Sequence, residues 1–162
     1  MAWVERKRLA AFYLTTANLR QALKEGLLLA ALAIPEAVGA ARFLVGGIAW
    51  APPGMAFMAL ANGFFAASLI EEPLFRGFLL GFLRRWGLGE AAAVIIQAVI
   101  FLSGHLRYAA RGQWWMFAWV LAWGLILGWQ ASRHRTIAGT VVTHALVNTI
   151  VFMFIGGAVT SL

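Results

Sequence analysis

The sequence predicts an all-α protein, a polytopic transmembrane helical bundle of about four or five spans. Hydrophobic residues make up 62% of its 162 residues and charged residues only 12%. Soluble domains are about 45–50% apolar and about 25% charged. A soluble protein of this size has too little interior to bury so much apolar surface, so the composition indicates a membrane protein.

Long apolar segments separate the charged groups. We expect residues 1–25, which mix charges with aliphatic and aromatic side chains, to form an amphipathic segment at the membrane surface. Residues 26–162 should form the bundle. Its apolar segments are residues 26–50, 55–83, 90–106, 114–130 and 136–155. Pro35 and Glu36 interrupt the first segment, which favours either a kinked span or a short span followed by a re-entrant piece.

The second segment, residues 55–83, is the longest. At 1.5 Å per residue a straight helix of this length would run about 43 Å, whereas the hydrocarbon core is about 30 Å thick. We therefore expect the helix to be tilted, or broken near Pro73. Between the last two segments, residues 132–135 form a predicted basic loop, in which His134 should face solvent or lipid headgroups. The tryptophans are expected to be anchors at the membrane interface.

The net charge of +7 is typical of topology signals and contacts with anionic lipids, because the basic residues cluster between apolar segments. We therefore expect membrane lipids, and no nucleic acid, as partners. With the N-terminus in the cytoplasm, two basic residues, Arg107 and Arg111, lie in outer segments. Nine lie in inner segments: Arg6, Lys7, Arg8, Arg20, Lys24, Arg84, Arg85, Arg133 and Arg135. Arginine exceeds lysine and alanine is abundant, which suggests a bacterial cytoplasmic membrane.

Glu71 and Glu72 follow an uncharged stretch inside the longest apolar segment. Ionised groups within a membrane helix are costly and usually functional. Residues four apart share a helix face, so Glu72 should pair with Arg76. Glu71 lies about 100° around the helix from Glu72, which leaves its carboxylate for chemistry.

His144 and Asn148 are also four residues apart, so an imidazole and an amide face the same point and make a candidate oxyanion hole. His105 ends a different apolar segment and is expected to meet Glu71 across the bundle. Together, Glu71 and His105 would deprotonate a water for attack on a peptide carbonyl. The substrate would be a membrane-associated protein or peptide. The sequence gives no indication of the oligomeric state.

Three sequence motifs, EEPLFR at 71–76, FLSGH at 101–105 and HALVN at 144–148, resemble the EExxxR, FxxxH and HxxxN motifs of the CAAX prenyl protease and bacteriocin-processing family of intramembrane endopeptidases. The resemblance covers roughly residues 60–150. It implies that Glu71 and His105 activate water and that His144 and Asn148 stabilise the oxyanion. The other fixed motif positions are Glu72, Arg76 and Phe101. Members of this family have been described both as metalloproteases and as metal-independent glutamate proteases.

Three alternatives stay open. Two histidines and a glutamate would supply three zinc ligands, so a zinc-dependent protease using the same residues is the first. We favour a site without metal or other cofactor, because the sequence has no H-E-x-x-H pattern. A proton-coupled transporter or channel is the second, although no inverted repeats appear. A non-catalytic scaffold or immunity protein of the same fold is the third. The chain has no cysteine, which excludes a cysteine nucleophile.

Overall fold

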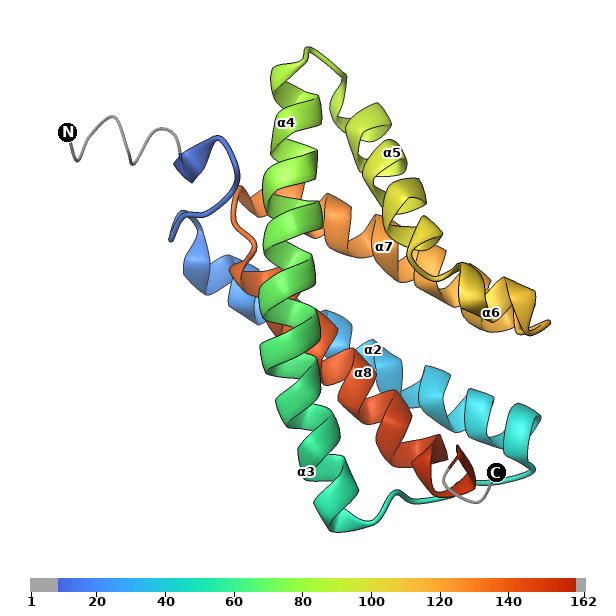
Figure 1. Ribbon diagram of the computed structural model, residues 1–162. Helices are drawn as coiled ribbons and strands as arrows, with labels where there is room; N and C mark the ends of the chain where they lie inside the picture. Colours follow the sequence, from blue (N-terminus) through green and yellow to red (C-terminus); the bar gives the residue numbers. More distant parts are fainter. Residues whose placement is uncertain (1–8, 160–162) are drawn as a thin grey trace.

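The computed structural model describes residues 9–159, apart from the side chains of residues 44–45, 66–67 and 156–159. All regular secondary structure in this part of the chain is helical, which confirms the predicted fold class (Figure 1). The helices are α2 (Leu19–Val45), α3 (Pro53–Asn62), η1 (Gly63–Glu71), η2 (Pro73–Leu79), α4 (Leu80–Arg85), α5 (Glu90–Ser103), α6 (Leu106–Ala110), α7 (Trp114–His134) and α8 (Ala138–Val159).

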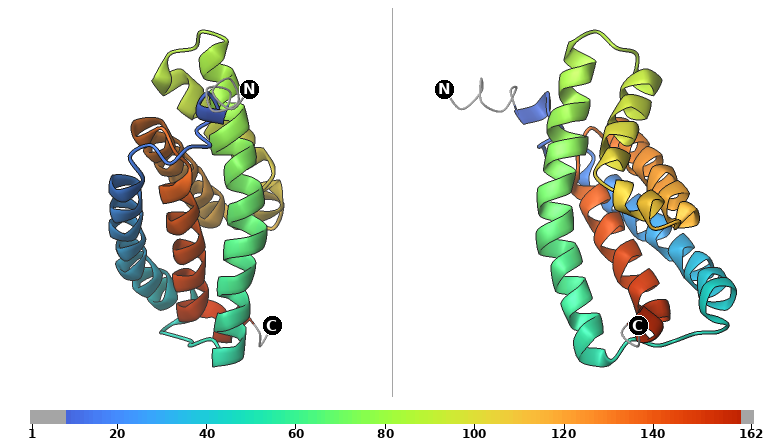
Figure 2. Two further views of the ribbon diagram at one scale, coloured as in Figure 1. Left: turned by 90° about the vertical axis from the view of Figure 1, so that its left-hand side faces the viewer. Right: turned by 45° about the vertical axis from the view of Figure 1, so that its right-hand side comes forward.

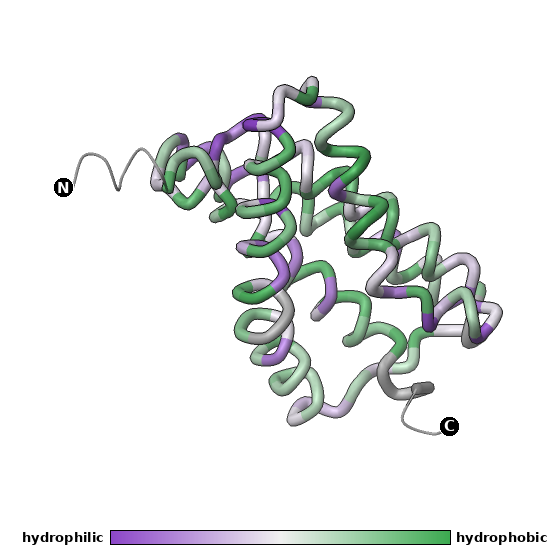
Figure 3. The backbone as a smooth tube through the Cα atoms, turned by 45° about the horizontal axis from the view of Figure 1, so that its top comes forward, coloured by the Kyte–Doolittle hydropathy of each residue, from purple (hydrophilic) through white to green (hydrophobic). Residues whose placement is uncertain are grey.

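Within the described residues, three helices are long and apolar enough to cross a membrane: Leu19–Phe43, Pro53–Arg85 and Ala138–Ile155. The apolar helix α5 is shorter, with 14 residues, and it packs along α7 beside them. Large hydrophobic side chains cover the outside of the bundle, for example Phe57, Phe65 and Ile70. Most of each helix is hydrophobic (Figure 3). An apolar outer surface of this extent is what a lipid environment requires.

Helix α8 lies between α2 and the long helix formed by residues 53–85 (Figure 2). The contact of α2 with α8 depends on small side chains. A Cβ atom added at Gly26 would lie 2.7 Å from the carbonyl oxygen of Gly139, and one at Gly139 would lie 2.4 Å from that of Ala22. On α2 the buried small residues continue as Ala30, Ala33, Ala37 and Ala41. Small residues at this spacing let membrane helices pack with their backbones close together.

The longest helix is continuous from Pro53 to Arg85, so the alternative of a break near Pro73 was wrong. Instead, η1 and η2 are π-helical on either side of Glu72. In an α-helix, proline would clash with the carbonyl four residues earlier. The wider π-helical turn avoids this clash, and such turns occur often at functional sites. Both glutamates therefore lie at a local irregularity in a helix that otherwise runs without a break.

Residues 9–18 pack across one end of the bundle, and Tyr13 is buried there against α4, α5 and α7. The main-chain N–H of Ile137 donates a hydrogen bond to the carbonyl of Tyr13. Gly81 permits the close approach, because a Cβ atom at Gly81 would lie 2.5 Å from the carbonyl oxygen of Ala11. Helix α2 already begins at Leu19, earlier than the predicted bundle boundary at residue 26. Residues 1–8 lie outside the described residues, so an interfacial role for the whole segment 1–25 remains a prediction.

The predicted basic loop at 132–135 was wrong, because α7 extends through His134. His134 is buried, and its Nε2 lies 3.0 Å from Oε2 of Glu25 on α2. The Asn18 side chain donates a hydrogen bond to the His134 carbonyl. The N-terminal segment and α2 therefore cover a side chain that we had expected to face solvent or headgroups.

Candidate active site

Glu72 and Arg76 form a fully buried ion pair within the long helix. The Arg76 Nη1 lies 2.9 Å from Glu72 Oε1, and both side chains have no exposed surface. This is the pair that their spacing predicts. A buried ion pair needs further hydrogen bonds to offset the loss of hydration of both charges. The structure supplies one from another helix.

The same Glu72 oxygen lies 2.8 Å from Nδ1 of His144, which is buried on α8. Because a carboxylate only accepts hydrogen bonds, Nδ1 of His144 carries the proton in this contact. Glu72 therefore links the first motif to the third, in addition to pairing with Arg76. Sequence spacing alone did not predict this contact, because it joins residues 72 positions apart.

Glu71 lies on the other side of His144. Its Oε2 is 4.0 Å from the His144 Nε2, and its side chain is 33% exposed. The two carboxylates thus face opposite nitrogens of one imidazole. We had expected His105 to meet Glu71. Among the described residues the ion pairs of Glu71 include His144 alone, while Glu71 and His105 share the lining of one cavity.

His105 follows α5 in the turn that leads into α6. Its Nδ1 lies 3.1 Å from the carbonyl oxygen of Phe101. A carbonyl oxygen accepts, so Nδ1 is the protonated nitrogen and the lone pair of a neutral ring is on Nε2. A backbone hydrogen bond of this kind fixes both the tautomer and the orientation of a functional histidine.

The aromatic ring of Phe101 is buried among the motif residues. It packs against the rings of His105, at 4.8 Å between centroids, and of His144, at 6.3 Å. The guanidinium carbon of Arg76 lies 4.1 Å from its centroid. Phe101 thus spaces the two imidazoles and covers the buried cation. This explains physically why an aromatic residue at this position suits the site.

A cavity of about 580 Å³ lies at this site, within the size range of ligand pockets. Its lining includes all four predicted catalytic residues, Glu71, His105, His144 and Asn148. It also reaches the exposed side chains of α6 and of the turn into α7. The structure therefore brings these four residues together from the long helix, from α8 and from the turn between α5 and α6.

Sequence reasoning missed part of this cavity. Trp115, Trp119 and Trp123 line it, although we expected the tryptophans to be interface anchors. Glu36, an exposed residue that follows Pro35 on α2, accepts hydrogen bonds from the indole N–H groups of Trp119 and Trp123. The sequence did contain a signal for this contact. One apolar segment holds a carboxylate, and another holds two tryptophans four residues apart, which share a helix face.

The chain matches a model of a known protein family. Residues 52–150 match the model described as type II CAAX prenyl endopeptidase Rce1-like. The chain belongs to this Rce1-like family. The matched region includes the first, second and third motifs, and thus all four predicted catalytic residues, whereas Glu36 lies outside it. No curated protein and no solved structure matched the chain.

Membership of the Rce1-like family assigns the chain to a family of membrane proteases. In the described part of the chain, no group of three or more His, Cys, Asp or Glu side chains is arranged to hold a metal ion. The donors present, two imidazoles and the Glu71 carboxylate, are types that zinc accepts, but their arrangement here does not form a ligand set. We therefore derive no step through a metal.

Proposed function

We propose that the chain is an intramembrane endopeptidase that hydrolyses a peptide bond of a membrane-associated protein or peptide by means of an activated water. Glu71 and His105 are the residues that activate the water. His144 and Asn148 stabilise the oxyanion that forms when water attacks the carbonyl carbon. Membership of the protease family and the shared cavity support this proposal.

The first step needs an acceptor for the proton of the attacking water. The Glu71 carboxylate is partly exposed in the cavity and is not tied to Arg76 in an ion pair. The Nε2 lone pair of His105 is a second acceptor, because its Nδ1 is held by the Phe101 carbonyl. A base that faces the water and is fixed by a second bond is what general base catalysis requires. The same groups then return a proton to the leaving amine as the C–N bond breaks.

The second requirement is a donor to the developing oxyanion. With Nδ1–H directed at Glu72, His144 donates from Nε2 only when the ring carries both protons. Two carboxylates and one guanidinium lie around this part of the site. The Asn148 amide lines the same cavity one helical turn further along α8. Donors held in place in this way can lower a barrier without reorganising during the reaction.

The observation that carries the proposal is the position of His144 between Glu72 and Glu71. A purely structural ion cluster needs only the first of these contacts. A second carboxylate, left partly exposed and facing a cavity, adds cost to a membrane helix without adding a buried bond. The Glu71 carboxylate has a function if it acts on a substrate that enters the cavity.

We also propose that the N-terminus is cytoplasmic, in a bacterial inner membrane. The start of α2 and the ends of α4 and α7 lie at one end of the bundle, joined through residues 13–18. This end carries Arg84, Arg85 and Arg133, while Arg107 and Arg111 lie with α6 at the other end. The positive-inside rule favours the first end as cytoplasmic.

The test is cleavage by purified protein in liposomes. Two quenched fluorescent peptides serve as substrates: one ends in an S-farnesylated cysteine motif, and one is an unmodified leader-like peptide with an apolar helix. We expect cleavage of at least one by the wild type and loss of cleavage in Glu71→Gln. The control is Glu90→Gln, which neutralises an exposed glutamate at the start of α5. Equal activity of Glu71→Gln and wild type would refute the proposal.

A further inference from the structure

Helix α6 carries two arginines, Arg107 and Arg111, at the exposed end of the active-site cavity. The main-chain N–H of Arg111 donates a hydrogen bond to the Arg107 carbonyl, so the two residues are one helical turn apart. Side chains at this spacing share a helix face. Both residues are exposed, and both line the cavity that also contains Glu71 and His105. Two positive charges therefore lie together where the cavity opens.

The charges of these two arginines are not balanced by the protein. Among the residues that the structure describes, no glutamate forms an ion pair with Arg107 or Arg111. Arg76 and Arg133, by contrast, each pair with a glutamate. Like charges four residues apart on one helix face repel each other and destabilise the helix. An anion between the two guanidinium groups would remove this repulsion, and a planar guanidinium binds a carboxylate through two parallel hydrogen bonds.

Arg107 is connected to His105 through the ring of Tyr108. The rings of His105 and Tyr108 stack, with centroids 6.0 Å apart and an interplanar angle of 16°. The guanidinium carbon of Arg107 lies 5.0 Å from the centroid of the Tyr108 ring, and its Nη2 donates a hydrogen bond of 3.3 Å to the Tyr108 hydroxyl. An anion bound at Arg107 would therefore be separated from His105 by one aromatic ring.

The charges along the cavity favour one direction for a bound peptide. The Glu71 carboxylate repels an anion, whereas the two arginines attract it. We propose that Arg107 and Arg111 form a subsite for a carboxylate of the peptide substrate, either its chain end or an acidic side chain. A peptide held there would direct its scissile bond toward Glu71 and His105. The inference rests on the proposed function, because it assigns part of the substrate to the same cavity.

The first test measures binding and needs no cleavage. The probe is a dye-labelled peptide with an apolar helix, made in four forms that combine a C-terminal carboxylate or amide with glutamate or glutamine near that end. Fluorescence anisotropy reports its binding to Glu71→Gln in a maltoside detergent, which contains no phosphate. We expect the loss of one of the two carboxylates to weaken binding about tenfold. Equal binding of all four forms would overturn the proposal and would leave the arginines as contacts for lipid phosphate.

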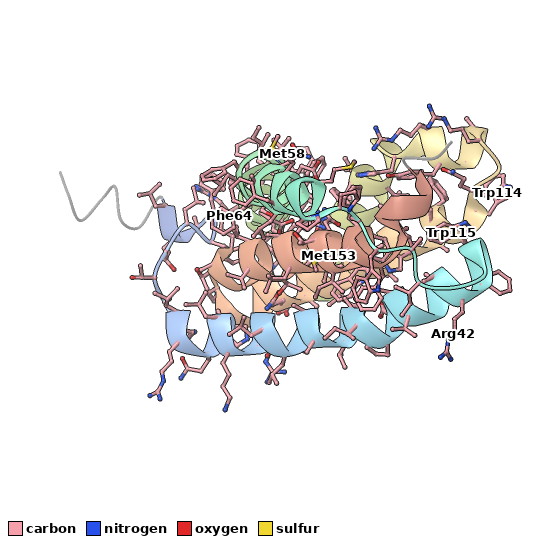
Figure 4. The ribbon with its side chains drawn as sticks, turned by 90° about the horizontal axis from the view of Figure 1, so that it is seen from below. Arg42, Met58, Phe64, Trp114, Trp115 and Met153 are labelled. Carbon is pink, nitrogen blue, oxygen red and sulfur yellow. The ribbon has the colours of Figure 1, made fainter. Side chains whose placement is uncertain are left out.

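Substitution of the arginines shows whether they produce this preference. Arg107→Gln and Arg111→Gln, each added to Glu71→Gln, should remove most of it. The matched control is Arg42→Gln, because Arg42 is an exposed arginine in the last turn of α2 that points away from the bundle (Figure 4). Arg111→Glu should instead favour a peptide with lysine in place of glutamate, a reversal that a structural role would not produce. An unchanged preference in the glutamine variants would overturn the subsite.

The second test measures cleavage of the same four peptides by the wild type in liposomes. Removal of the recognised carboxylate should raise KM about tenfold and leave kcat nearly unchanged. High salt should reduce this difference, because it screens exposed charges. A lower kcat with an unchanged KM would contradict a binding subsite. If the wild type cleaves none of the peptides, the proposed function fails, while the anisotropy measurement still decides the carboxylate subsite.

Discussion

Nδ1 of His144 lies 2.8 Å from the carboxylate of Glu72, which also binds Arg76 at 2.9 Å. One oxygen thus joins a buried cation on the long helix to an imidazole on α8. This relationship separates the two adjacent glutamates. Glu72 lies at the centre of these contacts, whereas Glu71 is partly exposed in the cavity, where we propose that it acts.

The two glutamates should therefore respond differently to substitution. Glu72→Ala leaves the buried Arg76 charge unpaired, so it should destabilise the protein by about 3–5 kcal/mol. Glu71→Gln changes a partly exposed group, so it should alter stability by less than about 0.5 kcal/mol while removing activity. Unfolding in detergent, monitored by tryptophan fluorescence, measures the change in stability. Cleavage in liposomes measures the change in activity. Equal destabilisation by the two changes would contradict this division.

Asn148 should contribute to the rate rather than to stability. Its amide lines the cavity, and no side-chain hydrogen bond of Asn148 is recorded among the described residues. Loss of one oxyanion donor typically lowers kcat by about 10²–10³. Asn148→Ala should show this loss with an unchanged melting temperature. Thr149→Ala is a matched control on α8, because within the described residues the Thr149 hydroxyl donates its hydrogen bond to the Ala145 carbonyl of the same helix. If Asn148→Ala keeps full activity, the amide is not an oxyanion donor.

The close contact of α2 with α8 predicts a sensitive position. Gly139→Val would bring a Cβ atom to 2.4 Å from the Ala22 carbonyl oxygen, so the helices must separate and His144 must shift with α8. We expect loss of folded protein, measured as monodisperse yield in detergent. Gly39→Ala is the control, because a Cβ atom at Gly39 on α2 has nothing within 4 Å. Alanine there should stabilise α2 by about 0.5–1 kcal/mol. Normal yield of Gly139→Val would contradict the packing.

The orientation can be tested with single cysteines, because the chain has none. Gly89→Cys, at the turn after α4, should be protected from an impermeant thiol reagent added outside spheroplasts. Ala110→Cys, at the end of α6, should react. Permeabilised cells should label both, which controls for access to each thiol. The reverse pattern would place the N-terminus outside the cytoplasm.

Whether the activity depends on a metal can be measured directly. The proposed mechanism predicts that cleavage survives dialysis against a strong chelator and that active protein contains far less than one zinc per chain. Loss of activity on chelation, with recovery on adding zinc, would support the zinc-dependent alternative. His105→Ala would then lower bound zinc as well as activity.

The sequence predicted the structure well where the helical repeat alone determines which side chains lie close together. The spacing of Glu72 and Arg76 gave the ion pair, and the apolar segments gave the helices. It did not predict contacts that depend on how helices cross, such as Glu72 with His144 or Glu36 with Trp119 and Trp123. Burial of His134 was missed for the same reason, because residues far away in the chain cover it. The continuity of the helix through Pro73 depends on π-helical turns, which the residue pattern did not indicate.

The most direct test of the central claim is a double-mutant cycle between Glu71 and His105, measured as kcat in liposomes. Residues that act on one water as a unit lose nearly all their effect when either is removed. The combination of Glu71→Gln and His105→Ala should therefore be no slower than the slower single variant. Losses that multiply in the double variant would show that the two side chains act independently, and would contradict the account.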